Sequence, residues 1–140
     1  MKYLGKRGAI MAQDMTDKQT NPDIAVDFLR LVVVGHIDEA YNRYVDMQGK
    51  HHNIYFPAGF PTLKKAMIDN HNQYQNKRLN VIHVISDGDL VVVHSNIELR
   101  QGEQEMLVVH IFRFSEGKII EMWDVGQEIP KDSTNLDGAY

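Results

Sequence analysis

The hydrophobic pattern of this chain changes its period after Arg78, and this change limits the fold more than any other feature. Before Arg78, apolar residues recur three and four positions apart, as they do along one face of a helix. After it, apolar and polar residues alternate, as they do in strands that bury one face. Helices followed by strands are typical of an α+β domain, in which the helices cover one face of an antiparallel sheet.

Three helices are predicted in the first half of the chain. The first begins at Asn21-Pro22, because Asn suits an N-cap and Pro suits the first turn, and it ends at Gly35. The second, over 37–45, is short, and the third runs from about 62 to 75. The segment 46–61 between them is rich in Gly, His, Asn and Pro, so we expect a loop with a functional role.

Four strands are predicted after the helices. Gly-containing dipeptides separate them and favour hairpins, so consecutive strands should be antiparallel neighbours. The predicted strands span residues 81–86, 90–100, 105–115 and 119–127. Residues 1–20 are polar and unpatterned, which indicates an N-terminal arm before a domain over 21–140. The acidic tail after 127 is expected to pack irregularly across an opening or an interface.

Length and composition exclude several classes of function. The 140 residues suffice for one domain with its own core, and the absence of cysteine excludes disulfides, Cys-ligated metals and a thiol nucleophile. A net charge of −4 without a basic stripe argues against a nucleic-acid partner. The apolar runs are far shorter than the roughly 20 residues that span a bilayer, so we expect a cytoplasmic protein with no membrane contact.

The register of the last hairpin decides which ionisable side chains meet. His110 lies in the middle of an apolar row on one strand, and Asp124 lies on the next strand. A three-residue loop over 116–118, with a bulge, places His110 opposite Asp124. A two-residue turn at 116–117 would place His110 opposite Trp123 instead. The hydrophobic match between the strands favours the first register.

A carboxylate beside an imidazole in an apolar concavity suits proton transfer. Burial raises the pKa of a carboxyl group and a neighbouring cation lowers it, so the pair of Asp124 and His110 could provide a general base near neutral pH. The alternative is a buried hydrogen bond that only satisfies two polar groups of the core. The sequence leaves both interpretations open.

Five other residues are candidates for substrate binding. His94, on the second strand, is a candidate for the lining of the same cavity as His110, with a satisfied or exposed strand histidine as the alternative. His52 and Asn53 are candidates for side chains that point into the mouth of the cavity. Tyr44 and Trp123 are expected to pack in the core, with ligand contact as the alternative. No His or acidic pair has the close spacing of a metal site, so we expect neither metal nor cofactor.

A homodimer is predicted from the second strand. Val91, Val93, Ile97 and Leu99 share one side of it, which we assign to the outer face of the sheet. That face would be too apolar to remain in contact with water, so we expect a second copy of the chain to cover it.

The stretch HIFRFSEGKIIEMWD, from His110 to Asp124, together with the Val-Gly-Gln that follows it and a Pro-containing tail, resembles the C-terminal signature of the SnoaL-like polyketide cyclase family. Tyr44-Val45 and His52-Asn53 resemble the tyrosine and the His-Asn element of that family. The resemblance covers about 23–137. It implies a cone-shaped α+β barrel of the nuclear transport factor 2-like (NTF2-like) superfamily, in which three helices pack on a strongly curved four-stranded antiparallel sheet around a deep pocket.

The resemblance also implies a reaction without metal or cofactor. The residue matching Asp124 acts as acid and base in an intramolecular aldol condensation, and the residue matching His110 assists. Asp124 would then abstract an acidic C–H proton, and His110 would orient the substrate or stabilise the enolate. One departure is that 46–51 separate the tyrosine from the His-Asn element, which usually follows closely. We expect a lyase or isomerase-like enzyme for a small apolar substrate, with a noncatalytic ligand-binding module as the alternative.

Overall fold

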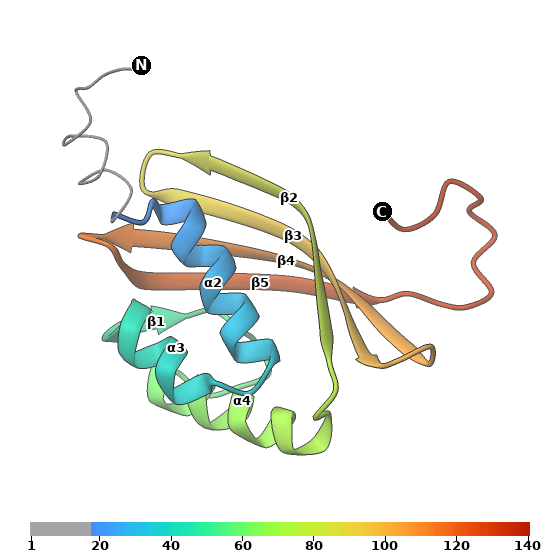
Figure 1. Cartoon of the computed structure of the whole chain (residues 1–140), viewed down its shortest axis with the longest axis horizontal. Coiled ribbons are helices and arrows are strands. Elements are labelled where there is room, and N and C mark those ends of the chain that lie inside the picture. Colours follow the sequence, from blue (N-terminus) through green and yellow to red (C-terminus); the bar gives the residue numbers. More distant parts are fainter. Residues whose placement is uncertain (1–17) are drawn as a thin grey trace.

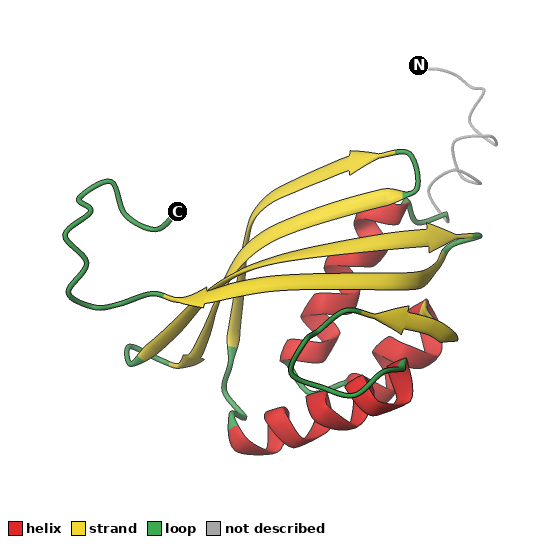
Figure 2. Ribbon diagram, turned by 180° about the vertical axis from the view of Figure 1, so that it is seen from behind, coloured by secondary structure: helices red, strands yellow, loops and turns green. Residues whose placement is uncertain are grey.

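The computed structural model describes residues 18–140, which form three helices on one side of a curled, open sheet (Figures 1 and 2). Its helices are α2 (Asn21–Val33), α3 (Ile37–Tyr44) and α4 (Phe60–Gln73). Its strands are β1 (Val45–His51), β2 (Arg78–Asp87), β3 (Leu90–Arg100), β4 (Gln104–Ser115) and β5 (Lys118–Glu128). The order across the sheet is β1-β5-β4-β3-β2. The predicted α+β class, with three helices and an antiparallel meander, is confirmed.

Strand β1 was not predicted, because it lies in the segment that we expected to be a loop. It runs parallel to β5 and pairs Val45 with Ile119 and His51 with Met122, so the sheet has five strands and is mixed. The two strands approach each other closely at Gly49. A Cβ atom there would lie 2.3 Å from the backbone oxygen of Ile120, so this position requires glycine.

The helices begin at slightly different residues from those predicted. Thr20 rather than Asn21 is the N-cap of α2, since its hydroxyl accepts from the Asp23 N–H at 3.3 Å and the Asp23 carboxylate accepts from the Thr20 N–H at 3.2 Å. Helix α4 begins two residues before the predicted start. No helix within 18–140 is long and apolar enough to cross a membrane.

The last hairpin has the favoured register but a different turn. The predicted three-residue loop is wrong, because Ser115 pairs directly with Lys118 across a two-residue turn whose Glu116 and Gly117 both have positive φ, 50° and 77°. A bulge at Ile120 then shifts the pairing by one residue. Beyond the bulge, His110 is opposite Asp124, as the hydrophobic match required.

The two faces of β3 are the reverse of those predicted. Val91 and Val93 are fully buried and pair with Phe112 and His110, on the concave face that the helices cover. The outward-facing residues are therefore Leu90, Val92, His94 and Asn96. Both sets contain apolar side chains, so alternation alone could not say which face is covered. The apolar row that we assigned to the outer face therefore lies on the concave face, and it no longer supports the predicted homodimer.

Edge-to-face aromatic contacts join the helices to the sheet. Phe28 of α2 lies 5.3 Å from Tyr41 of α3 and 5.8 Å from Phe112 of β4, measured between ring centroids. Tyr41 in turn lies 6.3 Å from Phe60 at the start of α4. All four rings are buried. These contacts place the core between the helices and the middle of the sheet.

The C-terminal tail leaves the end of β5 on the side away from the helices (Figure 1). Glu105 of β4 holds it at two points, since its carbonyl accepts from the Ile129 N–H at 2.9 Å and its carboxylate accepts from the Tyr140 hydroxyl at 3.1 Å. Lys131 Nζ also donates to the Gly102 carbonyl at 3.2 Å. The predicted arm over 1–20 lies outside the described residues except for its last three.

Candidate active site

Asp124 lies where the buried part of β5 gives way to its exposed end. Along the concave face of this strand Met122 is buried, Asp124 is half-buried and Gly126 is exposed. His110 is opposite Asp124 on β4, and its ring lies parallel to that of Phe112 at 5.9 Å. The carboxylate and the imidazole are therefore neighbours between the core and the open end of the sheet.

Burial favours the neutral form of the His110 imidazole. Burial lowers its pKa, and the charge of Asp124 offsets this effect only in part. Its Nδ1 atom is buried and has no hydrogen-bond partner among residues 18–140. His110 can therefore offer a neutral ring to a ligand beside the Asp124 carboxyl group.

Asn53 holds the carboxylate of Asp124. Its side-chain N–H donates to Asp124 Oδ2 at 3.0 Å. This contact depends on β1, because the parallel pairing with β5 continues for one residue, where the His52 N–H donates to the Met122 carbonyl at 2.8 Å. The strand that the sequence did not predict is therefore what brings Asn53 to the site.

His51 positions this turn, and our sequence reasoning missed it. The ring is buried, and its Nδ1 accepts from the Asn53 N–H at 3.2 Å. Because Nδ1 accepts, the proton lies on Nε2, which donates to the Pro57 carbonyl at 2.9 Å. The signal in the sequence was weak: His51 is two residues before Asn53 in a segment without apolar alternation.

His52 and Trp123 lie on the opposite, convex face of the sheet. Their rings stack at 5.0 Å with an angle of 12°, and His52 Nε2 is 2.6 Å from the Glu121 carboxylate. This hydrogen bond lowers the pKa of Glu121. Because side chains alternate along β5, Trp123 points away from the face that carries Asp124. The expectation that His52 points into the mouth of the same cavity is therefore wrong.

His94 also lies on the convex face, so the expectation that it lines a cavity with His110 is wrong. It pairs with Val109, and its Nδ1 is 3.0 Å from Nδ1 of His83 on β2. The reason is the inverted assignment of the two faces of β3. The structure therefore brings together only Asp124, His110 and Asn53 of the predicted residues.

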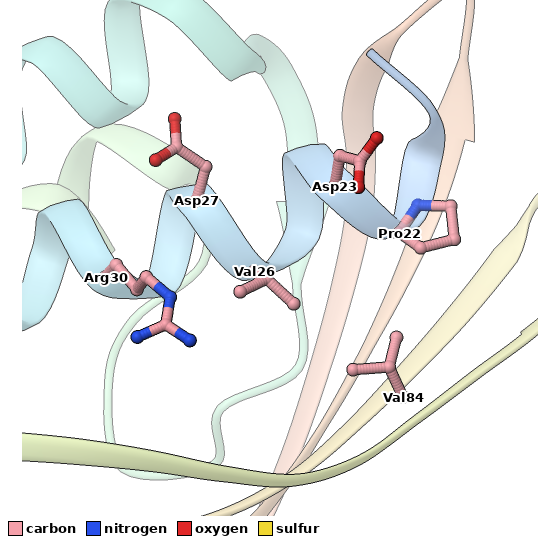
Figure 3. A pocket seen from close by; sticks show the side chains of 6 residues that line it. All are labelled: Pro22, Asp23, Val26, Asp27, Arg30 and Val84. Atoms are coloured by element: carbon pink, nitrogen blue, oxygen red, sulfur yellow. The ribbon is translucent and has the colours of Figure 1, made fainter.

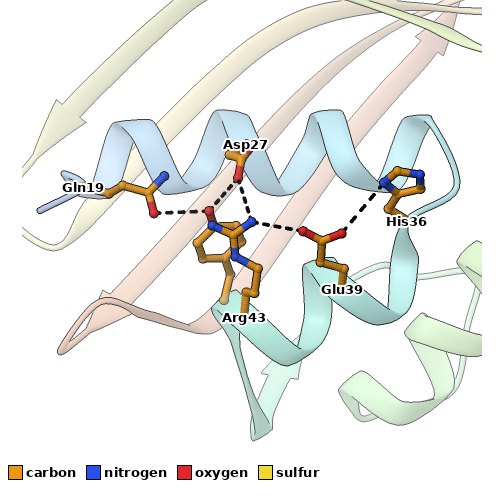
Figure 4. Close-up of polar contacts among 6 residues, drawn as sticks. Gln19, Asp27, His36, Glu39 and Arg43 are labelled. Atoms are coloured by element: carbon orange, nitrogen blue, oxygen red, sulfur yellow. Dashed lines mark hydrogen bonds and ion pairs between the residues drawn. The ribbon is translucent and has the colours of Figure 1, made fainter. Parts of the chain in front are cut away.

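A polar network between α2 and α3 includes Asp27, Glu39 and Arg43 (Figure 4), and Tyr44 belongs to it. Its hydroxyl donates to the Asp27 carboxylate at 2.5 Å and lies 3.2 Å from the Gln19 side-chain oxygen. Arg43 extends the network, with its guanidinium 3.9 Å from Asp27 and 3.1 Å from Glu39. Tyr44 is thus a structural residue here and does not reach Asp124.

Tyr41 is the tyrosine that faces the candidate site. Burial raises the pKa of its hydroxyl, and the charge of Asp124 raises it further, so the group is neutral. Within the part of the chain that the structure describes, this hydroxyl is buried without a hydrogen-bond partner, and so is that of Ser95 on the concave face of β3. An unsatisfied buried polar group costs about 1–3 kcal/mol. Such groups point to a water molecule or ligand that completes them.

Neither a metal centre nor the groove beside α2 coincides with the candidate site. Within 18–140, no three His, Asp or Glu side chains gather closely enough to hold a metal ion. A surface groove of about 350 Å³ runs between α2 and β2 and contains none of the predicted residues (Figure 3). It is lined by Pro22, Asp23, Val26, Asp27, Arg30 and Val84.

Comparison with known proteins gives matches at the level of structure. No family model matches the chain. No curated protein matches it significantly. A SnoaL-like polyketide cyclase from Agrobacterium tumefaciens str. C58 superposes with a TM-score of 0.65 at 16% identity, over 79% of this chain and 93% of that one. The chain has the fold of the SnoaL-like polyketide cyclases.

Other proteins with this SnoaL-like, NTF2-like fold are not described as cyclases. An NTF2-like protein of unknown function from Burkholderia xenovorans LB400 matches with a TM-score of 0.64 at 14% identity, over 81% of this chain and 88% of that one. AclR, a proposed hydroxylase from Streptomyces galilaeus, matches with a TM-score of 0.64 at 17% identity, over 76% and 88%. Because one fold carries several activities, the chemistry has to be argued from the site.

Proposed function

We propose that this protein is a cofactor-independent acid/base enzyme that transfers a proton at a carbon next to a carbonyl group, in a small apolar substrate. The reaction would be an aldol condensation of the cyclase type or an isomerisation. The observation that supports this proposal is the carboxylate of Asp124, which lies opposite a neutral imidazole at the edge of the core and is held by Asn53.

Asp124 is the base in this mechanism. Asn53 donates to Oδ2, so we assign Oδ1 as the oxygen that takes the proton from carbon. The electron pair of the broken C–H bond moves into the carbonyl group and forms an enolate. In an isomerisation the same carboxyl group returns the proton to another carbon; in an aldol condensation the enolate carbon attacks a second carbonyl group, and the carboxyl group protonates the resulting alkoxide.

His110 assists through hydrogen bonding. A neutral imidazole carries one N–H, which can donate to the developing enolate oxygen without competing for the proton that Asp124 removes. The lowered pKa of His110 favours this role, because burial keeps the ring in its neutral form. The apolar neighbour Phe112 strengthens the interaction by excluding water.

Proton exchange in D₂O tests the proposal with 2-tetralone, an apolar ketone with acidic C–H bonds beside its carbonyl group. We expect the wild-type chain to speed the loss of the α-proton signals in ¹H NMR spectra. Asp124→Asn should reduce this rate at least about 100-fold, in line with the usual contribution of a general base. His110→Ala should reduce it less.

Asp87→Asn is the matched control, since Asp87 is an exposed carboxylate at the end of β2. It should leave the exchange rate unchanged. Exchange that persists in Asp124→Asn at the wild-type rate would rule out the assigned base. Binding of 2-tetralone to the wild-type chain without any exchange would identify a ligand-binding module instead of an enzyme.

A further inference from the structure

A polar hollow of about 570 Å³ lies between the end of α4 and the turn that joins β3 to β4 (Figure 1). One wall is the segment 72–76, which ends α4 and leads to β2, and the other is the segment 99–101. Its volume is within the range of roughly 300–1,000 Å³ that is usual for small-molecule sites. None of the residues predicted for the active site lines it.

Side-chain amides dominate the lining of this hollow, and both walls contribute them. Each amide has donor and acceptor atoms, so it matches a hydroxyl group, which also donates and accepts. One of the five amides is engaged, since Gln73 Nε2 donates to the Tyr74 hydroxyl at 3.2 Å. The others make no side-chain hydrogen bond within the described residues. The five are Asn72, Gln73, Gln75, Asn76 and Gln101.

Arg100 gives the hollow a positive charge. Its guanidinium lies over the ring of Tyr74, 4.9 Å from the ring centroid, so this cation–π contact joins the two walls and orients the planar group. Arg100 is exposed and has no ion pair among residues 18–140. Its N–H groups are therefore available to a ligand. Three other arginines do form ion pairs with carboxylates: Arg43, Arg78 and Arg113.

The charges around the hollow favour an anion. Of the described residues, no Asp or Glu lines it. Glu103, the acidic residue of the same turn, lines a different hollow with Ile129 and Lys131. The C-terminal end of a helix carries partial negative charge, but the Lys77 amine donates to Asn70 in the last turn of α4 and offsets it.

The form of these groups selects the kind of anion. A guanidinium presents a planar fork of N–H groups that binds a carboxylate through two parallel hydrogen bonds. A phosphate group would find one guanidinium and no helix N-terminus, because α4 presents its C-terminal end here. The amides beside Arg100 suit hydroxyl groups on the same ligand.

We infer that this hollow binds a small carboxylate that carries several hydroxyl groups, such as a sugar acid. Arg100 binds the carboxylate, and the amides of the two walls bind the hydroxyl groups. The hollow is separate from the candidate active site, since Leu99 is six residues beyond Val93, the partner of His110, which is about 20 Å along a strand. The inference does not depend on the proposed function.

Four ligands that carry different parts of this chemistry test the site. Glucuronate has a carboxylate and hydroxyl groups, glucose lacks the carboxylate, acetate lacks the hydroxyl groups, and inorganic phosphate is a different anion. Each is titrated into the full chain at constant ionic strength, and binding is followed in ¹H–¹⁵N NMR spectra. We expect glucuronate to bind at least about tenfold more tightly than the other three, which corresponds to about 1.4 kcal/mol. The shifted signals should belong to 72–76 and 99–101.

Variants of the two walls separate the contributions. Arg100→Gln should reduce the preference for glucuronate over glucose to about twofold or less, and Arg100→Lys, which keeps the charge without the fork, to about threefold. Gln101→Ala should weaken glucuronate and glucose alike, by about threefold, and leave acetate unchanged. Arg30→Gln is the matched control, because Arg30 is an exposed arginine in the groove beside α2. It should alter none of the four dissociation constants.

Equal binding of glucuronate and glucose, or a tenfold preference that survives Arg100→Gln, would overturn the site. Tighter binding of phosphate than of glucuronate would overturn the assignment to a hydroxylated carboxylate. Shifted signals centred on His110 and Asp124 would place the ligand in the candidate active site and would overturn a separate site. Proton exchange by the wild-type chain tests Asp124 alone, so its failure would leave this site intact.

Discussion

Replacing Gly49 by alanine tests how the candidate site depends on β1. The new Cβ atom would lie 2.3 Å from the Ile120 carbonyl oxygen and 2.9 Å from the Phe60 ring. Ordinary contacts of a Cβ atom lie at 3.4 Å or more, so the backbones of β1 and β5 would have to separate by about 1 Å. Overpacking of this kind costs typically 1–3 kcal/mol, and we expect about 2 kcal/mol for Gly49→Ala.

The assay is thermal unfolding followed by circular dichroism, with Gly126→Ala as the matched control. Gly126 is also a strand glycine, but its nearest neighbour to a new Cβ atom is at 3.4 Å, so alanine fits. The control should be neutral or more stable by up to about 1 kcal/mol, because alanine loses less backbone entropy than glycine. Gly49→Ala should lower the unfolding midpoint by roughly 6–8 °C.

The same substitution should release Asn53 from Asp124. A shift of about 1 Å is enough to break the 3.0 Å hydrogen bond between them, because geometry beyond about 3.5 Å no longer supports one. The NMR signals of the Asn53 side-chain amide should then move toward those of a solvent-exposed amide. A Gly49→Ala chain as stable as Gly126→Ala, with unchanged Asn53 signals, would refute the close approach of β1 and β5.

Three further predictions follow from contacts described above. Because burial lowers the pKa of His110 below its unfolded value, the unfolded chain binds more protons, so the free energy of unfolding should fall as the pH decreases below about 6.5. In urea titrations, the free energy of unfolding of His110→Gln should depend less steeply on pH than that of the wild type. An equal dependence in the two chains would contradict this cause. Tyr44→Phe should cost about 1–2 kcal/mol of stability, through loss of the bond to Asp27, and leave proton exchange unchanged; slower exchange would place Tyr44 in the site. We also propose that a second copy of the chain covers the convex face, where Val125 is 72% exposed. Light scattering should then give twice the mass of 16.1 kDa, and Val125→Lys should halve it, whereas a monomeric wild-type chain would exclude this dimer.

The register of the last hairpin could be predicted from the sequence, while its turn could not. The apolar rows on β4 and β5 match in only one alignment, and the structure has that alignment beyond Ile120. The turn is local, and a bulge can absorb one residue between the turn and the matched rows at little cost. The hydrophobic match therefore determined the position of His110 relative to Asp124 even though the predicted loop length was wrong.

Strand β1 and the faces of β3 show what the pattern could not determine. The sequence of β1, VDMQGKH, lacks a continuous apolar alternation, and its partner β5 is about 70 residues away, so only tertiary pairing reveals it. On β3 both faces are apolar, so the period identified the strand but not its covered side. Ser95 lies on the covered side of β3 for this reason, and its place in the pattern does not differ from that of an ordinary core residue.

Consecutive residues at the end of β1 contact opposite faces of the sheet. His52 lies against Trp123 on the convex face, and the next residue, Asn53, reaches Asp124 on the concave face. A single peptide bond therefore connects the two faces at this edge. A molecule that displaces His52 from Trp123 would also move the Asn53 side-chain amide that donates to the Asp124 carboxylate. Binding on the convex face would therefore change the geometry of the candidate site on the concave face.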